Sequence, residues 1–197
     1  DYVSSNIGLF NQAYDLLEDK LSKDSLEAYI NAKITKDASH LFSFVRRPQY
    51  FSEHDTIKDL TLTREEILIN CGAFTGDTIR DFLETVGNQY NKIYACEPDS
   101  HNIRKLSDYI HAAIPDGTVT IVPKCISDQT ETVYFLNEGT MLSRKVEAPV
   151  PGAVSVESTT IDEMLDSSPA SLIVMDVEGN ELKALQGARQ TILQYKP

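Results

Sequence analysis

The sequence predicts an α/β fold, in which a parallel β-sheet carries helices on both faces and follows a helical N-terminal extension. Two observations lead to this prediction. From residue 67 onward, short apolar runs alternate with amphipathic helical patterns, which is the order of a parallel sheet joined by helices. The apolar run LIVM at 172–175 is unbroken, as is typical of a strand buried on both faces. We therefore expect a helical extension at residues 1–60 and an α/β domain at residues 61–197.

Local patterns then place the individual elements. Apolar residues at three- and four-residue spacing predict helices within 1–45, and a turn-rich stretch at 46–55 is expected to join the extension to the domain. In the α/β domain, strands are expected at 67–71, 92–96, 118–123, 131–137, 154–158 and 171–177. Helices are expected at 76–86, 102–110, 160–166 and 181–194. The strand at 131–137 interrupts the alternation, so we expect it to pair locally, before a loop with proline and glycine at 147–153.

Composition excludes several classes of protein. The 197 residues, 41% hydrophobic and 24% charged, suit one globular domain with a small appendage. A net charge of −12 argues against nucleic acid as a partner, because phosphate binding needs a surplus of Lys and Arg. No window approaches the roughly 20 apolar residues of a membrane span. Cys71, Cys96 and Cys125 lack metal-type spacing, so they are expected to be buried apolar residues in a protein of the reducing cytoplasm.

Small and acidic residues directly follow three of the predicted strands. Gly72 and Gly76 bracket the turn between the first strand and a helix that opens at Asp77, Glu97 follows the second strand, and Asp176 follows the last. In an open parallel sheet, ligands bind outside the carboxyl ends of the strands. A glycine turn lets the backbone approach a ligand, and a helix N-terminus presents free N–H groups to it. An acid after the next strand accepts hydrogen bonds from ribose hydroxyls, so the sequence predicts a nucleoside site.

The kind of nucleoside follows from what the turn lacks. The dinucleotide fingerprint G-x-G-x-x-G needs a glycine where the backbone approaches the pyrophosphate, and this turn has Phe74 in its middle. The Gly-Lys-Ser/Thr signature of a P-loop is also absent. A ligand with a ribose but no phosphates is therefore favoured, and S-adenosylmethionine is the common one. NAD is the weaker alternative.

Five ordered blocks resemble the FkbM family of S-adenosylmethionine-dependent methyltransferases: INCGAFTGDT, IYACEPDSHNIRKL, CISDQTETVYF, STTIDEML and IVMDVEGNELKALQGARQTI. The resemblance covers residues 65–197. It implies a class I methyltransferase (Rossmann-like) fold, S-adenosylmethionine as the cofactor and, for many members, methylation of a hydroxyl on a sugar or natural product. The first block of the family usually opens with Asp, and Asn70 here keeps the hydrogen-bonding side chain without the charge.

The resemblance also implies which residues hold the cofactor. Those that would line its methionine portion, or hold its amino-acid end and cap the following helix, are Asn70, Gly72, Ala73, Phe74, Gly76, Asp77 and Thr78. Glu97 would bind the ribose. Those that would surround the adenine are Pro98, Asp99, Cys125, Ile126, Ser127 and Asp128.

Asp176 and Glu178 are the candidate catalytic residues, because they end the last strand beside the first and should face the methyl-bearing end of the cofactor. A carboxylate there can orient the acceptor hydroxyl and take its proton, or bind a divalent cation that does so. No His joins these acids in the sequence, so no metal site is predicted. In the alternative, Asp176 contacts the amino group of the cofactor and Glu178 caps the next helix. Gly179 after them suggests a close approach of the backbone.

The predicted function is an O-methyltransferase that acts on a hydroxyl of a sugar, glycan or other small molecule. An NAD-dependent oxidoreductase and a non-catalytic cofactor-binding relative are the alternatives. The N-terminal extension is expected to pack on the sheet or to form a homodimer, or else to act as a substrate lid. The class I sheet normally has more strands than the resemblance accounts for, so we expect the domain to be incomplete at its C-terminus, with the edge of strand 171–177 uncovered or paired with another molecule.

Overall fold

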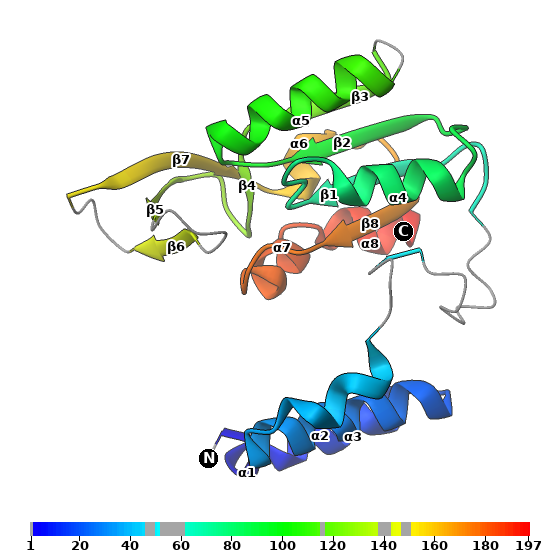
Figure 1. The fold of residues 1–197 in the computed structure, drawn as a ribbon, viewed down its shortest axis with the longest axis vertical. Coiled ribbons are helices and arrows are strands. Elements are labelled where there is room, and N and C mark those ends of the chain that lie inside the picture. Colours follow the sequence, from blue (N-terminus) through cyan, green and yellow to red (C-terminus); the bar gives the residue numbers. More distant parts are fainter. Residues whose placement is uncertain (1, 46–49, 52–61, 115–116, 138–142, 147–150) are drawn as a thin grey trace. The chain divides into compact units, whose positions relative to one another are not determined.

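The computed structural model describes residues 2–45, 50–51, 62–114, 117–137, 143–146 and 151–197. It divides into two compact units, Asp1–Thr56 and Ile57–Pro197 (Figure 1). The domain boundary expected between residues 60 and 61 lies outside the described residues, as do most of the joint expected at 46–55 and the first part of the loop expected at 147–153. Within the described ranges, no helix combines the length and the apolar character that a membrane span requires.

The N-terminal unit is helical, as predicted. Its elements are α1 (Tyr2–Ser5), α2 (Ile7–Leu16), α3 (Lys20–Thr35) and the 3₁₀ helix η1 (Ala38–Phe44). Asp19 caps α3, because its side chain accepts a hydrogen bond from the backbone N–H of Ser22 at 2.8 Å. Among the described residues of this unit only Val3 is buried, and Leu16 and Phe42 are 82% and 71% exposed. The apolar positions of these helices therefore build only a small core.

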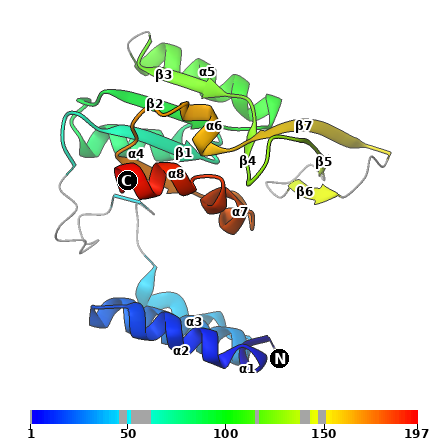
Figure 2. The same cartoon turned by 180° about the vertical axis from the view of Figure 1, so that it is seen from behind.

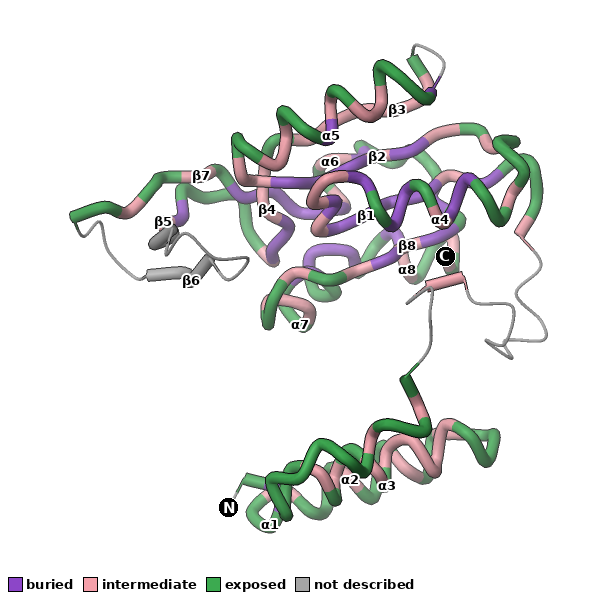
Figure 3. The backbone as a smooth tube through the Cα atoms, viewed as in Figure 1, coloured by how far each residue is buried: buried purple, intermediate pink, exposed green. Residues whose placement is uncertain are grey.

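The α/β domain is built on a four-stranded parallel sheet in the order β3-β2-β1-β8. The strands are β1 (Ile67–Cys71), β2 (Lys92–Cys96), β3 (Val119–Val122) and β8 (Leu172–Met175). β1 and β2 match the predicted ranges, and β3 and β8 are shorter than predicted. Figure 3 shows β1 and β2 as largely buried. The predicted α/β fold class is confirmed.

Helices cover both faces of this sheet. α4 (Asp77–Thr85) and α5 (Ser100–Ala113) lie on one face, and α6 (Ile161–Leu165) and α8 (Arg189–Tyr195) lie on the other (Figures 1 and 2). Ile69 and Cys71 pack with Ile161 and Leu165 in a cluster of buried side chains. Because side chains alternate along a strand, Asn70 between them points to the opposite face, which α4 and α5 cover.

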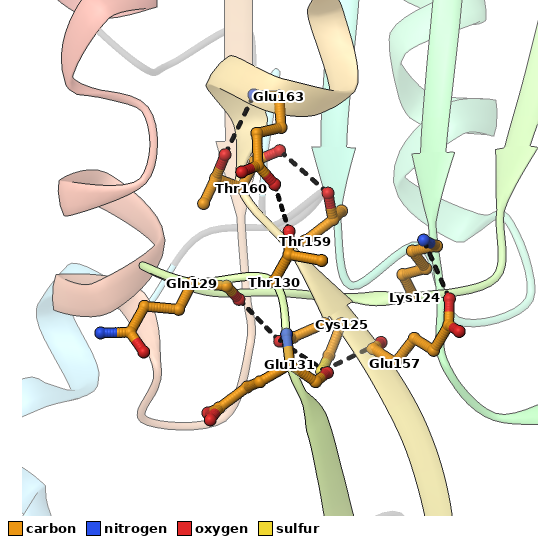
Figure 4. A network of polar contacts seen from close by, with 10 residues as sticks. Lys124, Cys125, Gln129, Thr130, Glu131, Glu157, Thr159, Thr160 and Glu163 are labelled. Atoms are coloured by element: carbon orange, nitrogen blue, oxygen red, sulfur yellow. Dashed lines mark hydrogen bonds and ion pairs between the residues drawn. The ribbon is translucent and has the colours of Figure 1, made fainter.

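A second sheet projects from the first, in the order β4-β7-β5-β6 (Figure 1). Its strands are β4 (Cys125–Ile126), β5 (Thr132–Asn137), β6 (Ser143–Val146) and β7 (Ala153–Thr159). β5 pairs antiparallel with both β6 and β7, so the local pairing expected of strand 131–137 is confirmed. The short strands β4 and β6 were not predicted. At the base of this sheet, Lys124 pairs with Glu157 at 2.9 Å and Thr130 donates a hydrogen bond to Glu163 (Figure 4).

The helix predicted at 181–194 is two helices, α7 (Glu181–Gln186) and α8. The break falls at Gly187, where a Cβ atom would lie 2.1 Å from the carbonyl oxygen of Ser127. The carboxylate of Asp162 then accepts hydrogen bonds from the backbone N–H groups of Gln190 and Thr191, at 2.9 and 2.8 Å. Glycine at position 187 therefore leaves room for Ser127. The carbonyl oxygen of Gly187 accepts a hydrogen bond from the backbone N–H of Asp162 at 3.0 Å, and the side chain of Asp162 stabilises the start of α8.

A buried carboxylate joins the first residues of β1 and β8. Glu66 is 7% exposed and accepts hydrogen bonds from the backbone N–H of Thr63 at 2.7 Å and from the hydroxyl of Ser171. Ser171 in turn accepts a hydrogen bond from the backbone N–H of Ile67 at 2.8 Å. Burial by itself raises the pKa of Glu66, but the hydrogen bonds from Ser171 and Thr63 outweigh it and leave the pKa below its ordinary value.

The lowered pKa of Glu66 predicts a pH-dependent contribution to stability. A carboxyl group with a depressed folded-state pKa stabilises the protein above its unfolded pKa of about 4.3, and this contribution is lost as the pH falls through the folded value. The wild type should therefore be more stable than Glu66→Gln at pH 7, by a margin that shrinks toward pH 3. Urea denaturation of both proteins at several pH values tests this. A margin independent of pH would contradict it.

Candidate functional site

Four loops meet at the carboxyl edge of the parallel sheet. The strand register places Cys71 beside Cys96 on one side and Met175 on the other, and Cys96 beside Val122. The segments that follow β1, β2, β3 and β8 therefore leave the sheet along a single edge. This edge is where open parallel sheets bind their ligands. Of the predicted site residues, Gly72–Gly76, Glu97–Asp99, Asp176 and Glu178 lie in the loops that follow β1, β2 and β8. Asp77 and Thr78 lie in the first turn of α4, and Cys125 and Ile126 form β4 of the second sheet.

The loop after β1 is fixed to both neighbouring strands. The backbone N–H groups of Gly72 and Ala73 both donate to the carbonyl oxygen of Cys96 at 2.9 Å. Gly72 has a φ of +85°, and a Cβ atom on it would lie 2.0 Å from the carbonyl oxygen of Asp176. The backbone N–H of Asp176 donates to the carbonyl oxygen of Cys71 at 2.9 Å. Glycine is therefore required at position 72 by the neighbouring strand, whatever ligand the loop holds.

The second glycine of the turn is required by helix packing. Gly76 has a φ of +95°, and a Cβ atom there would come within 2.7 Å of the Tyr109 ring on α5. Gly76 is also the N-cap of α4, and no described side chain makes a capping hydrogen bond there. The prediction that Asp77 and Thr78 cap this helix is wrong, because α4 already begins at Asp77. Both residues lie in the first turn of α4, where the negative charge of Asp77 interacts favourably with the positive end of the helix dipole.

Phe74 occupies the left-handed region, with a φ of +46°, which is rare for a bulky side chain. Its backbone N–H donates to Oε2 of Glu97 at 2.9 Å. Strained backbone of this kind persists only where the surroundings hold it, and it occurs often at ligand sites. The Glu97 carboxylate is thus the group that holds the middle of the loop in place.

Glu97 is buried, with 6% of its surface exposed. Besides the N–H of Phe74, it accepts hydrogen bonds at Oε1 from the backbone N–H of Asp99 at 2.9 Å and from the side-chain amide of Asn102 at 3.3 Å. Burial raises the pKa of Glu97, and these hydrogen bonds offset only part of that effect. Asp99 in turn caps α5 by accepting from the backbone N–H groups of His101 and Asn102. Pro98 between them is partly exposed.

The four residues of segment 125–128, which are expected at the adenine together with Pro98 and Asp99, divide into two pairs. Ile126 and Ser127 are each 1% exposed, and Ile126 packs in the core cluster that contains Cys71 and Cys96. Cys125 and Asp128 are partly exposed. The structure therefore leaves Cys125 and Asp128 as the members of this segment whose side chains retain accessible surface.

Asp176 and Glu178 are both exposed, and they do not share a strand face. β8 ends at Met175, and the backbone N–H of Asn180 donates to the carbonyl oxygen of Val177, which closes a turn. Both central residues of this turn have positive φ, +53° at Glu178 and +93° at Gly179, as in a type I′ turn. No atom of the described residues lies within 4 Å of a Cβ placed at Gly179, so no packing within the described part of the chain requires glycine at this position.

Two residues that the sequence did not single out hold this turn in place. Oε1 of Glu181 accepts hydrogen bonds from the backbone N–H groups of Val177 and Gly179 at 3.2 and 3.1 Å, and backbone hydrogen bonds lower the pKa of Glu181. The side-chain amide of Asn180 donates to the carbonyl oxygen of Ile126 at 2.7 Å. The sequence did contain a feature that could have predicted the role of Glu181. It is a glutamate in the first turn of a predicted helix, where its side chain can reach the preceding backbone N–H groups.

Asn70 has an unsatisfied polar group beneath the loop after β1. The side chain is 1% exposed, and its Nδ2 atom has no hydrogen-bond partner among the described residues. A buried donor without a partner costs about 1–3 kcal/mol. Among the described residues, no cluster of three or more His, Cys, Asp or Glu side chains is arranged to hold a metal ion. The unpaired Nδ2 donor of Asn70 therefore suits a ligand group that accepts a hydrogen bond.

A family model decides which group of proteins this chain belongs to. The methyltransferase FkbM domain matches residues 70–197, which include all four loops at the carboxyl edge of the sheet. The chain belongs to the FkbM methyltransferase family. The resemblance predicted from the sequence blocks is thereby confirmed, and membership of the FkbM family supports a methyltransferase function.

A solved FkbM methyltransferase structure shares this fold. The crystal structure of the methyltransferase FkbM from Methylobacillus flagellatus KT has a TM-score of 0.78 and 24% sequence identity to this chain. The match covers 99% of this chain and 47% of that protein, so the chain spans about half the length of that FkbM structure. An rRNA methylase from Streptococcus thermophilus matches 32% of this chain and 33% of its own, with 15% identity and a TM-score of 0.27. None of the curated proteins matches the chain.

Proposed function

We propose that the Ile57–Pro197 unit is an S-adenosylmethionine-dependent O-methyltransferase domain that acts on a hydroxyl of a sugar, glycan or other small molecule. The observation that supports this most strongly is the contact between the strained loop after β1 and the buried Glu97 carboxylate. Phe74 and Glu97 come from the ends of adjacent strands and join at 2.9 Å. A nucleoside bound over this contact would meet the loop backbone and the carboxylate together.

The residues present fit the cofactor that the family implies. Among the described residues, Nδ2 of Asn70 has no partner and the start of α4 has no side-chain cap, so a carboxylate such as that of an amino acid would satisfy donors at this position. Glu97 offers acceptor oxygens to ribose hydroxyls, and Pro98, Asp99, Cys125 and Asp128 would flank the adenine. When bound, S-adenosylmethionine supplies an electrophilic methyl group.

The chain's own contribution would be to hold the acceptor hydroxyl and to take its proton. Asp176 is exposed, and its backbone is joined to the loop after β1 through Cys71 and by contact with Gly72. We assign it the role of general base. Glu178 lies two residues further, on the turn that Glu181 holds, and we assign it the orientation of the acceptor.

NAD is the competing cofactor, and Phe74 argues against it. A pyrophosphate needs the close approach that a glycine in the middle of the turn permits, and Phe74 fills that position with its backbone held by Glu97. Calorimetric titration of the protein with S-adenosylhomocysteine and with NAD separates the two. Binding of NAD alone would overturn the proposal. Release of methylated product from a panel of glycan and small-molecule acceptors then separates a methyltransferase from a non-catalytic relative.

The change Glu97→Gln is expected to weaken S-adenosylhomocysteine binding at least tenfold. It removes the negative charge that strengthens the hydrogen bonds to the ribose, each worth about 1.5–3 kcal/mol, while the side chain keeps its size. Isothermal titration calorimetry measures the dissociation constant.

Glu66→Gln is the matched control for this experiment. Glu66 is equally buried and also accepts hydrogen bonds, but it lies at the amino end of β1. Both variants lose a buried carboxylate, so both should lose some thermal stability. Only Glu97→Gln should change the dissociation constant, and equal binding by the two variants would remove Glu97 from the site.

A further inference from the structure

We propose that Asn102 is a positioning residue for Glu97: its side-chain amide occupies one acceptor position of the carboxylate until a ribose hydroxyl replaces it. Asn102 would thereby set how strongly the site distinguishes ribose from deoxyribose. This inference rests on the proposed nucleoside site.

The hydrogen-bonding capacity of the Glu97 carboxylate leads to this inference. An ionised carboxylate offers about four acceptor positions, two on each oxygen. Oε2 accepts from Phe74, and Oε1 accepts from both Asp99 and Asn102. One position on Oε2 therefore remains, and Oε1 is filled. A ribose with two hydroxyls directed at this carboxylate can donate the second one only if a present donor leaves.

Asn102 is the donor that can leave. The other two donors are backbone N–H groups, and Asp99 is fixed further as the cap of α5. The bond from Asn102 is the longest of the three, at 3.3 Å, and it comes from a side chain that is only partly buried. The backbone N–H of Asn102 is held separately by Asp99 at 2.9 Å. The amide can therefore rotate away from Glu97 while the helix start stays in place.

This exchange reduces the contribution of the second ribose hydroxyl to the binding free energy. In the wild type, that hydroxyl gains a bond to Oε1 at the expense of the bond from Asn102. In Asn102→Ala, Oε1 has an unfilled position in a buried carboxylate, so the hydroxyl gains the full bond. Loss of the hydroxyl from the ligand should therefore weaken binding more in the variant than in the wild type.

The experiment titrates the full chain with adenosine, 2′-deoxyadenosine and 3′-deoxyadenosine by calorimetry. For each deoxyadenosine, the dissociation constant is divided by that of adenosine. The larger of these two ratios is expected to rise about threefold or more in Asn102→Ala. Arg104→Ala, an exposed change on the same helix, should leave both ratios unchanged. An unchanged ratio in Asn102→Ala, with all three ligands weakened equally, would reduce Asn102 to a structural residue. A lower ratio would mean that Asn102 itself binds the ribose. Either result overturns the proposal.

A pH series gives a second readout. Removal of the Asn102 donor takes away a hydrogen bond that favours the ionised form of Glu97, so the Glu97 pKa should rise further. The affinity for adenosine, which needs the ionised carboxylate, should then be lost at a higher pH in Asn102→Ala than in the wild type. Superimposable pH profiles would contradict the inference. Failure of the wild type to bind S-adenosylhomocysteine would instead refute the proposed function.

Discussion

Replacement of Gly72 by alanine is expected to destabilise the α/β domain by about 2–5 kcal/mol. A Cβ atom in the left-handed region costs about 1–2 kcal/mol, and forcing extra volume into a packed site adds about 1–3 kcal/mol. The atom that it would meet is the carbonyl oxygen of Asp176, 2.0 Å away, which is backbone of the neighbouring strand and cannot rotate aside. Urea denaturation followed by circular dichroism measures the change in the free energy of unfolding.

Gly117→Ala separates the two contributions. Gly117 has nearly the same φ, +86°, and none of the described residues lies within 4 Å of a Cβ placed there, so this variant should lose only the conformational contribution. Equal destabilisation by the two substitutions would show that the contact with Asp176 does not constrain position 72. Gly72→Ala should also weaken S-adenosylhomocysteine binding, because relief of the clash would move the loop after β1 and Asp176 apart, and both belong to the proposed site.

The amide substitution Asp176→Asn is expected to lower the turnover number by about 10²–10⁴-fold, which is the usual contribution of a positioned general base. The side chain keeps its shape, and the substitution removes only an interaction made in the transition state. The dissociation constant of S-adenosylhomocysteine should therefore stay within about twofold of the wild-type value. The assay measures S-adenosylhomocysteine release with an acceptor that the wild-type protein methylates.

Glu178→Gln is the comparison for this variant, since it removes a second exposed carboxylate from the same turn. As an orienting residue, it should raise the Michaelis constant of the acceptor and leave most of the turnover. If Asp176→Asn instead abolishes cofactor binding, its carboxylate contacts the cofactor and is not the base. Full activity in both variants would place the proton acceptor elsewhere in the protein.

The sequence by itself determined the fold class and the order of the main elements. The mostly apolar segments 67–71 and 92–96 match β1 and β2 residue for residue, because the strands of a parallel sheet covered by helices on both faces are near-continuous hydrophobic runs. The same logic placed Gly72, Glu97 and Asp176 at one edge. Ordered sequence blocks also identified the family, because they follow each other in the order that the matched domain requires.

Only the tertiary structure decided which partners these residues have. The sequence explained Gly72 and Gly76 by a ligand, whereas the atoms that exclude a side chain there belong to Asp176 and Tyr109, which lie far away in the chain. It gave no reason for glycine at position 187, because the atom that a side chain there would meet is a carbonyl oxygen of Ser127.

The supports of the candidate site were hidden for the same reason. Glu181 and Asn180 hold the turn that carries Glu178, and Asn102 holds Glu97, through hydrogen bonds to backbone or carboxylate oxygen that no periodic pattern records. Periodicity reports how a residue is buried along its own helix or strand. Contacts between elements depend on where the sheet brings distant segments together, and those distances exist only once the chain has folded.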